Sequence, residues 1–361
     1  MTPPQLNLGR RRLWLGITNV GFWVLVSAVG LYCMVSGETS GMGLGLLGAI
    51  FVTVIATQAV FDFVGGNKLM PGPGPSVTNF LRGWVRGVLV HTLVLAGVGF
   101  ASAISLRYTG GFGAGIVLAM AALVFGRRQL LRAVGGGVVM EIAHDGETIV
   151  IAAINDPAFT GGVAGLGRRA KSLLPASWME TLPKPELAAE SSRRRWQIAS
   201  ALPARAFFLT LCWNLLGTFI GTQVFQLAER PPSVALIGHA CWMTLWAFAS
   251  LLVLPALSRK AVLAADRAAA DSGHAVRALI NRFPDLVGEN GSPNAALQTI
   301  FYPVPSAEIR LRQLAQPSTG FIPGNLARNN LYYSLATFTL LGRAVHCNVG
   351  RPALWVFPPS A

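Results

Sequence analysis

The sequence predicts a polytopic α-helical membrane protein with about six spans and a small cytoplasmic α+β domain. Of its 361 residues, 52% are hydrophobic and only 12% are charged, whereas soluble domains are near a quarter charged. Six apolar stretches also have, or nearly have, the roughly 17–25 helical residues needed to cross a bilayer. They lie at about 13–35, 43–64, 87–106, 111–126, 205–227 and 234–256.

The distribution of basic residues predicts the orientation. If the N-terminus is inside, the outer loops carry only Arg107 and Arg230 of the 29 Lys and Arg residues. Because Lys and Arg accumulate in cytoplasmic loops, we expect both termini in the cytoplasm, in a bacterial inner membrane. The net charge of +14 then indicates contact with membrane lipid. Since basic residues occur in every inner loop, it does not indicate a nucleic-acid partner.

The spans divide the chain into four parts. Residues 1–126 form an N-terminal membrane domain with four spans, and 205–256 form a transmembrane hairpin of spans five and six. The two remaining parts, 127–204 and 257–361, are cytoplasmic, and the second includes a C-terminal tail. Because they flank a hairpin, we expect them to fold together into one domain.

Several shorter elements are expected in the cytoplasmic parts. The run Glu147–Ile154 is rich in β-branched residues and ends at Asn155-Asp156-Pro157, which predicts a strand. A second short apolar run follows at 172–175. Helices are expected at 186–200, after Pro183 and Pro185, at 258–271 and near 329–341.

Four partial motifs follow one another around the hairpin. In order they are Ala158-Phe159-Thr160-Gly161, Leu182-x-x-x-Glu186-Leu187, Ser258-Arg259-x-x-Val262-x-x-Ala265-Asp266-Arg267 and Tyr302-Pro303-x-Pro305 with Ile309-Arg310-Leu311. Together they resemble the membrane zinc metallopeptidases of the HtpX and CAAX-prenyl-endopeptidase type, over about residues 85–316. The resemblance implies a zincin-like domain in which Phe159, Thr160, Gly161, Pro303 and Arg310 are family-like structural positions.

The zinc-site positions of that family are occupied differently in this chain. Counting on from Glu186-Leu187, the H-E-x-x-H slot falls on Arg193-Arg194-Arg195-Trp196-Gln197. In the later E-x-x-x-D slot, Val262 replaces the ligand Glu, while Asp266 is retained. The former zinc-site positions are therefore Arg193, Arg194, Gln197, Val262 and Asp266.

These replacements remove the chemistry of the resembled family. Zinc takes lone pairs from neutral His, thiolate or carboxylate, whereas Arg remains protonated and offers none. The general base position is occupied by Arg194. The resemblance thus implies a pseudopeptidase with no catalytic residue, no metal and no cofactor. Such a protein would act as a binding, scaffold or regulatory subunit, pairing its edge strand around 147–154 with an extended peptide or another membrane protein.

Asp266 carries the most specific structural expectation. In the resembled family this Asp orients the first His ligand of the metal. Here the position of that His is Arg193, and a buried carboxylate without a partner is unfavourable. We therefore expect Asp266 to pair with Arg193, or failing that with Arg194 or Gln197. The alternative for Arg193–Trp196 is a basic and aromatic belt on anionic lipid.

Two other functions stay open. Asp62 and His91 are ionisable residues inside predicted spans, a position that often has a function. A cavity lined by both would favour a lipid- or small-molecule-handling protein, or a transporter subunit, of unrelated fold. Because both residues lie close to the cytoplasmic interface, an ion pair is the structural alternative. A third reading is an active membrane metalloendopeptidase with unrecognised ligands.

Overall fold

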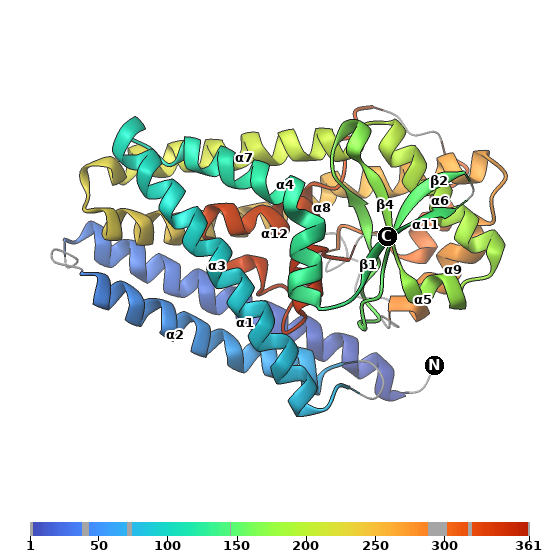
Figure 1. Ribbon diagram of the computed structural model, residues 1–361, viewed down its shortest axis with the longest axis horizontal. Coiled ribbons are helices and arrows are strands. Elements are labelled where there is room, and N and C mark those ends of the chain that lie inside the picture. The colour runs from blue at the N-terminus through green and yellow to red at the C-terminus, as the bar shows by residue number, and fades with distance from the viewer. Residues whose placement is uncertain are drawn as a thin grey trace.

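Most of the chain is helical, with a small sheet at one end of a bundle of long helices (Figure 1). The computed structural model describes residues 3–37, 43–70, 74–144, 146–287, 302–316 and 320–359. Within these ranges, six helices are long and apolar enough to cross a membrane. They are α1 (Pro3–Val35), α2 (Leu44–Phe63), α3 (Val77–Thr109), α4 (Gly113–Gly135), α7 (Leu202–Val224) and α8 (Pro232–Asp271).

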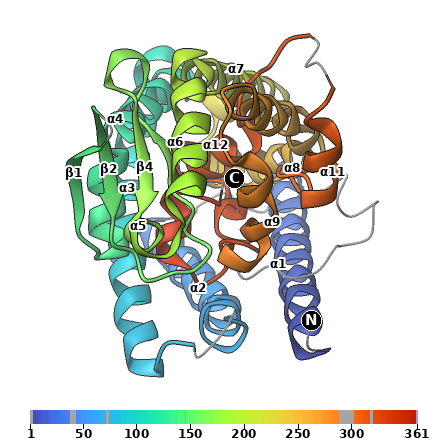
Figure 2. The ribbon, with the colours of Figure 1, turned by 90° about the vertical axis from the view of Figure 1, so that its right-hand side faces the viewer.

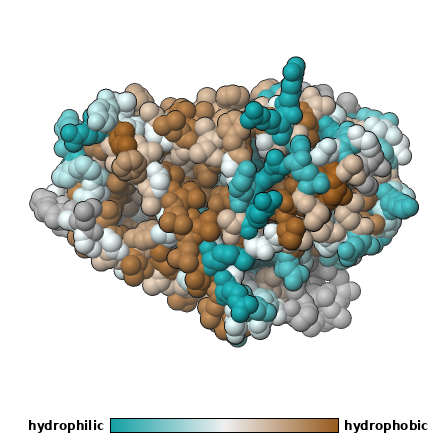
Figure 3. Space-filling view, viewed as in Figure 1, coloured by the Kyte–Doolittle hydropathy of each residue, from teal (hydrophilic) through white to brown (hydrophobic). Residues whose placement is uncertain are grey.

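The six helices confirm the prediction of six apolar stretches that are long enough to cross a membrane. They run side by side, and Figure 3 shows apolar side chains over their outer face, with hydrophilic ones gathered toward the sheet. Because lipid is as apolar as a protein core, large side chains such as Leu93 and Phe100 can face outward without cost. The chain enters α1 at the end of the bundle that carries the sheet (Figure 1).

Four helices, α1, α3, α4 and α8, extend well beyond the apolar runs from which they were predicted. α3 begins at Val77, ten residues earlier than expected, because Ser76 caps it by accepting a hydrogen bond from Asn79 N. α8 runs without interruption from Pro232 to Asp271. The sixth span and the helix expected at 258–271 are therefore a single helix, which connects the membrane bundle to the sheet domain.

The sheet has four strands in the order β1-β2-β4-β3. They are β1 (Val139–His144), β2 (Glu147–Ala152), β3 (Gly162–Ala164) and β4 (Lys171–Pro175). β2 pairs antiparallel with β1 and parallel with β4, and β3 pairs antiparallel with β4. The strand predicted at 147–154 is confirmed as β2, but it was wrongly expected at the edge. β1 and β3 are the edges, because the apolar run 172–175 forms β4 and covers β2.

The two faces of the sheet are buried in different clusters. Val150 and Ala152 of β2 pack with α4, whereas Ile149 and Ile151 point the other way. The second face is covered by α5 (Ala176–Thr181), α6 (Lys184–Ala199) and α9 (Val276–Val287), with α11 (Ala307–Gln313) packed beside α9 (Figure 2). Burial on both faces explains why β2 is apolar at successive positions and does not alternate. α6 confirms the helix expected at 186–200.

The C-terminal segment lies among the membrane-spanning helices, a placement that the sequence prediction did not include. It contains α12 (Leu326–Tyr333), 3-10 turns at Ser334–Thr337 and Leu340–Gly342, and α13 (Pro352–Val356). Tyr332 Oη donates to the Leu123 carbonyl of α4 at 2.8 Å, and Leu340 N donates to Thr244 Oγ1 of α8 at 3.2 Å. Non-helical backbone at this depth is tolerated because it is buried in protein.

Asp62 of α2 holds this segment in place. Its buried carboxylate forms an ion pair with Arg343 and accepts hydrogen bonds from Gly350 N at 2.8 Å and Trp84 Nε1 at 2.9 Å. Gln58 Nε2 adds a fourth contact at 3.0 Å. The structural alternative for Asp62, an ion pair, is therefore confirmed. A carboxylate engaged by four donors is an anchor between α2 and the C-terminal segment.

His91 of α3 belongs to the same region. Its ring meets Trp355 edge to face, with 4.9 Å between centroids, and its Nδ1 lies 3.1 Å from the Gly87 carbonyl. The Arg343 guanidinium lies 4.0 Å from the centroid of the same Trp355 ring. His91 and Asp62 are thus linked through Arg343 and Trp355, in a packed and hydrogen-bonded arrangement.

The backbone of the C-terminal segment approaches α2 so closely that two glycines are required. A Cβ on Gly66 would lie 2.1 Å from the Gly350 carbonyl oxygen. A Cβ on Gly350, whose φ is +69°, would lie 1.9 Å from the Asp62 carbonyl oxygen. Any side chain at either position would separate Asp62 from its donors.

Replacing Asp62 should loosen the C-terminal segment. Asp62→Ala would strand the Arg343 guanidinium, so we expect a loss of roughly 3–5 kcal/mol in the free energy of unfolding. The measurement is unfolding of the purified protein in mixed micelles. The exposed Asp285→Ala is the matched control. Equal stability of the two variants would show that Asp62 does not anchor the segment.

Candidate functional site

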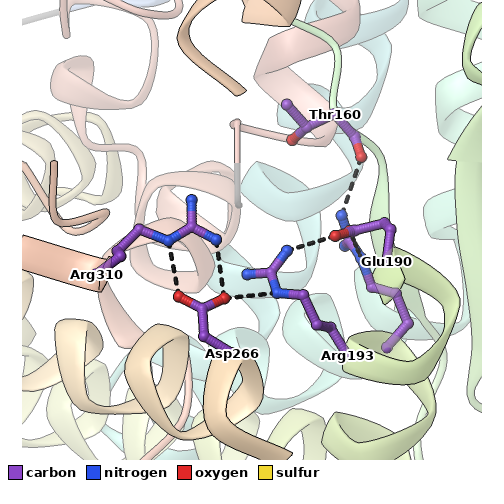
Figure 4. A network of polar contacts seen from close by, with 6 residues as sticks. Thr160, Glu190, Arg193, Asp266 and Arg310 are labelled. Carbon is purple, nitrogen blue, oxygen red and sulfur yellow. Dashed lines mark hydrogen bonds and ion pairs between the residues drawn. The ribbon is translucent and has the colours of Figure 1, made fainter. Parts of the chain in front are cut away.

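Asp266 and Arg193, which the sequence motifs align with a zinc site, meet where α6 crosses α8. α6 begins after Pro183, and Pro185 in its first turn suits a helix start. Arg193 Nε lies 2.7 Å from Asp266 Oδ1, and both side chains are excluded from solvent (Figure 4). The N–H is not aligned for a hydrogen bond, so the contact is an ion pair. The expected pairing of Asp266 with Arg193 is confirmed.

Arg310 of α11 holds the other side of the same carboxylate. Its Nε donates to Asp266 Oδ2 at 2.7 Å and its Nη2 donates to Oδ1 at 2.8 Å. This two-point contact matches the planar guanidinium to the planar carboxylate. Asp266 therefore joins three helices that are far apart in the sequence: α6, α8 and α11.

Glu190 completes the network from within α6. It lies one turn before Arg193 and Arg194, and its carboxylate forms ion pairs with both. The contact to Arg194 Nε is 2.6 Å long. Arg194 Nη2 also donates to the Thr160 carbonyl at 3.1 Å, which ties α6 to the segment before β3 (Figure 4). The spacing of three and four residues is that of neighbours on one helix face.

The network keeps its members charged. Burial alone would raise the pKa of the Glu190 carboxyl, but Arg193 and Arg194 outweigh it and hold that pKa below its ordinary value. Burial alone would lower the pKa of Arg193, but Glu190 and Asp266 raise it above its ordinary value. Side chains removed from water stay charged only when opposite charges compensate for the lost hydration. Removing one charged side chain from the network should therefore be strongly destabilising, because its partners would be buried without a counter-ion.

A pocket opens beside the network, at the end of the bundle where α7 begins. Its cavity volume is about 70 Å³. The wall is contributed by the edge strand β3, α6, α8, the start of α7, α4 and the C-terminal segment. The lining residues are Arg127, Gly161, Gly162, Val163, Arg194, Gln197, Leu202, Pro203, Ala206, Ala261, Val262, Asn325, Arg328, Asn329, Phe357 and Pro358.

The structure brings most of the predicted site residues to this place. Arg193 and Asp266 form the ion pair, while Arg194, Gln197 and Val262 line the adjoining pocket.

The family-like structural positions lie nearby, with one exception. Gly161 adopts φ +69° in the pocket wall, where a Cβ would lie 2.0 Å from the Leu173 carbonyl oxygen. Thr160 accepts from Arg194, and buried Phe159 packs against Phe357. Pro303 is buried and takes no part in the polar network. Asp62 and His91 lie in the bundle, linked to Arg343.

Sequence reasoning missed Glu190 and the role of Arg310. Both left a signal. Glu190 precedes Arg193 and Arg194 by three and four residues, the spacing of ion pairs along a helix. Arg310 was noted only as a family-like position, although an arginine in the last of the four motifs is a natural partner for Asp266. Arg127 and Arg328 of the pocket wall left none, because their approach depends on the fold of the C-terminal segment.

The residues at the former zinc positions do not suit zinc. Arg193 and Arg194 offer only donors, and Val262 offers no polar atom. In the described part of the chain, no group of three or more His, Cys, Asp or Glu side chains could hold a metal ion. The site's chemistry is that of arginine–carboxylate pairing, with positive charge in excess.

Comparison of the chain with protein-family models gives no match, and comparison with curated proteins gives no significant match either. The resemblance to membrane zinc metallopeptidases therefore stays a prediction.

Loss of the Asp266 carboxylate should destabilise the domain severely. Asp266→Ala would strand Arg193 and Arg310 in a buried site, and we expect a loss of roughly 3–5 kcal/mol in the free energy of unfolding. Asp271→Ala, at the exposed end of the same helix, is the matched control. Unfolding in mixed micelles measures both. A loss no larger than that of the control would contradict a clamp at Asp266.

The contribution of Glu190 should depend on pH. Because its pKa is lowered by folding, its stabilisation is complete above its ordinary pKa of 4.5 and is lost as the pH falls through the folded value. Glu190→Gln should therefore be less stable than the wild type at pH 7. The difference should shrink progressively below about pH 4.5. A difference that stays constant between pH 7 and pH 3 would rule out this linkage.

Proposed function

We propose that this chain is a membrane-embedded pseudopeptidase: a relative of the membrane zinc metallopeptidases that binds and does not hydrolyse. The observation that carries the proposal is the ion pair between Arg193 and Asp266. The motifs alone place these two residues, 73 positions apart, in one site. Chance matches to short motifs give no reason for that contact.

The ion pairs take over the mechanical role that a metal has in the resembled enzymes. Zinc joins the helix before the hairpin to the helix after it, and its removal can unfold the domain. Here Arg193 of α6 and Arg310 of α11 converge on Asp266 of α8. The domain is thus closed by side chains that need no ligand. In this arrangement the shape of a binding site is retained, while the metal centre that would activate water is absent.

The proposed binding surface is the edge strand β3 together with the pocket. Among the described residues, β3 pairs on one side only, with β4, and Gly162 and Val163 line the pocket. An extended segment can add to such an edge through main-chain hydrogen bonds, while the pocket receives a side chain. We assign the occupant as an extended segment of another membrane protein, on the cytoplasmic side of a bacterial inner membrane. This revises the edge expected at 147–154.

The two alternatives gain less support. A transporter would need ionisable groups accessible along a path, but Asp62 is engaged by Arg343 and three further donors. An active metallopeptidase would need at least three metal ligands in one place, and the described residues hold no such group.

Purified protein should contain no stoichiometric zinc, should be indifferent to chelators in its melting temperature, and should not hydrolyse casein. The missing ligand set is the reason. Elemental analysis, thermal unfolding with a chelator and a peptidase assay measure the three. About one zinc per chain together with hydrolysis would overturn the proposal.

The binding role has its own test. Unfolded casein-derived peptides should bind the protein in lipid nanodiscs, as measured by fluorescence polarisation. Val163→Trp should weaken binding at least tenfold, because it fills the groove beside β3. Val138→Trp, at an exposed position far along the chain from β3, should leave affinity unchanged. Absence of peptide binding by the wild type, or equal affinities of the two variants, would refute the role of β3.

A further inference from the structure

The pocket beside the ion-pair network has a strongly positive wall. Arg127, Arg194 and Arg328 all line it, and among the described residues of its wall there is no Asp or Glu. Gln197, Asn325 and Asn329 supply further polar groups. Of the three arginines, Arg194 is neutralised in part by Glu190. The other two have no carboxylate partner in the described part of the chain.

Arg127 of α4 is held without a counter-ion. Its Nε and Nη2 donate to the Val356 carbonyl at 3.0 and 2.9 Å. The guanidinium also lies 4.4 Å from the ring centroid of Tyr332 and 4.0 Å from that of Phe357. Carbonyl and ring contacts orient a cation and compensate part of its lost hydration, but they leave its full charge in place.

Arg328 of α12 is also incompletely satisfied. Its Nη1 donates to Cys347 Sγ at 3.2 Å, a weak acceptor. Its Nε is buried and, among the described residues, has no hydrogen-bond partner. A buried guanidinium nitrogen normally donates to an oxygen. Arg328 therefore has an unused donor in a side chain that lines the cavity.

The charges of the network and the pocket wall do not balance. Five guanidiniums gather in this part of the molecule, but only two carboxylates, and both carboxylates already hold other arginines. They are Arg127, Arg193, Arg194, Arg310 and Arg328 against Glu190 and Asp266. Uncompensated charge away from water is unfavourable, so an anion in the pocket would stabilise the arrangement.

We propose that this pocket binds a phosphate group. Guanidiniums form two-point hydrogen bonds with phosphate oxygens, and clustered arginines are the usual recognition element for it. A cavity of about 70 Å³ has room for a group of this size but not for a whole lipid or peptide. The pocket lies where α7 begins and α4 becomes polar, so the phosphate can belong to a phospholipid headgroup or to a soluble molecule. The same pocket receives a peptide side chain in the proposed function, but this inference rests on the arginines of the pocket wall and not on peptide binding at β3.

Inorganic phosphate is the first probe. With the full chain in neutral detergent, phosphate should raise the melting temperature above that in chloride of equal ionic strength, and the rise should increase with phosphate concentration. Arg328→Gln should weaken phosphate affinity at least tenfold, whereas Arg168→Gln, an exposed arginine, should not. No peptide is present, so the result does not depend on the proposed binding role.

A second variant decides the matter if Arg328→Gln fails to fold. Asn329→Asp places a carboxylate in the pocket wall at unchanged size. It should raise the melting temperature without phosphate and abolish the effect of phosphate, because the cations are already paired. Asn281→Asp, at an exposed position of α9, should do neither. A phosphate effect retained in Asn329→Asp would overturn the site.

Lipid nanodiscs distinguish the two sources. If the source is the membrane, discs containing phosphatidic acid should stabilise the wild type over discs of phosphatidylcholine alone, and soluble phosphate should then add nothing. If the source is soluble, phosphate should stabilise the protein equally in both discs. In either case Asn329→Asp should remove the effect. Stabilisation of the wild type by neither probe would refute the proposal.

Discussion

The buried carboxylate of Asp266 is the constraint on which the arrangement of the sheet domain depends. Water cannot solvate it, so its two oxygens must be matched by cations from the protein. Arg193 and Arg310 supply them, and each comes from a different helix. The relative positions of α6, α8 and α11 are therefore set by one charge balance. Glu190 extends this balance by a further turn of α6 and, through Arg194, to the segment that leads into β3.

Ion pairs also join distant parts of the chain at two other places. Asp62 of α2 receives Arg343, and Asp156, in the loop after β2, receives Arg351. Both arginines belong to the C-terminal segment that lies inside the bundle. Buried apolar side chains of this segment, such as Leu335, Leu354 and Val356, pack among the helices, but apolar contact is non-directional. Charge-assisted contacts give it a unique position, because any displacement would leave charges buried without partners.

Prediction from the sequence succeeded where the physics is local. Apolar runs identified the spans, because the thickness of the membrane sets their length, and the run in β2 identified a strand. The order of the strands could not be derived, because pairing of β2 with β4 joins residues separated by a loop and β3. The pairing of Arg193 with Asp266 could be predicted because the motifs of the resembled family place these two positions in one site. The contacts of Arg310 and Arg127 and the burial of α12 depend on packing between segments that are far apart in the sequence. No local sequence pattern predicts such packing.

The ion-pair network limits the chemistry that is open to the pocket beside it. In a catalytic zinc site, an open coordination position is directed at water or a substrate. In the ion-pair network, both carboxylates are already paired with arginines. Neither is therefore left to neutralise a further arginine nearby. Arg127 and Arg328 lie beside this network and keep their charge, because each is held by neutral contacts. Under the proposed function, the arginines at the zinc positions end hydrolysis, while Arg127 and Arg328, which lie outside those positions, keep the pocket positive. The chemistry left to such a site is recognition of an anion, in place of activation of water.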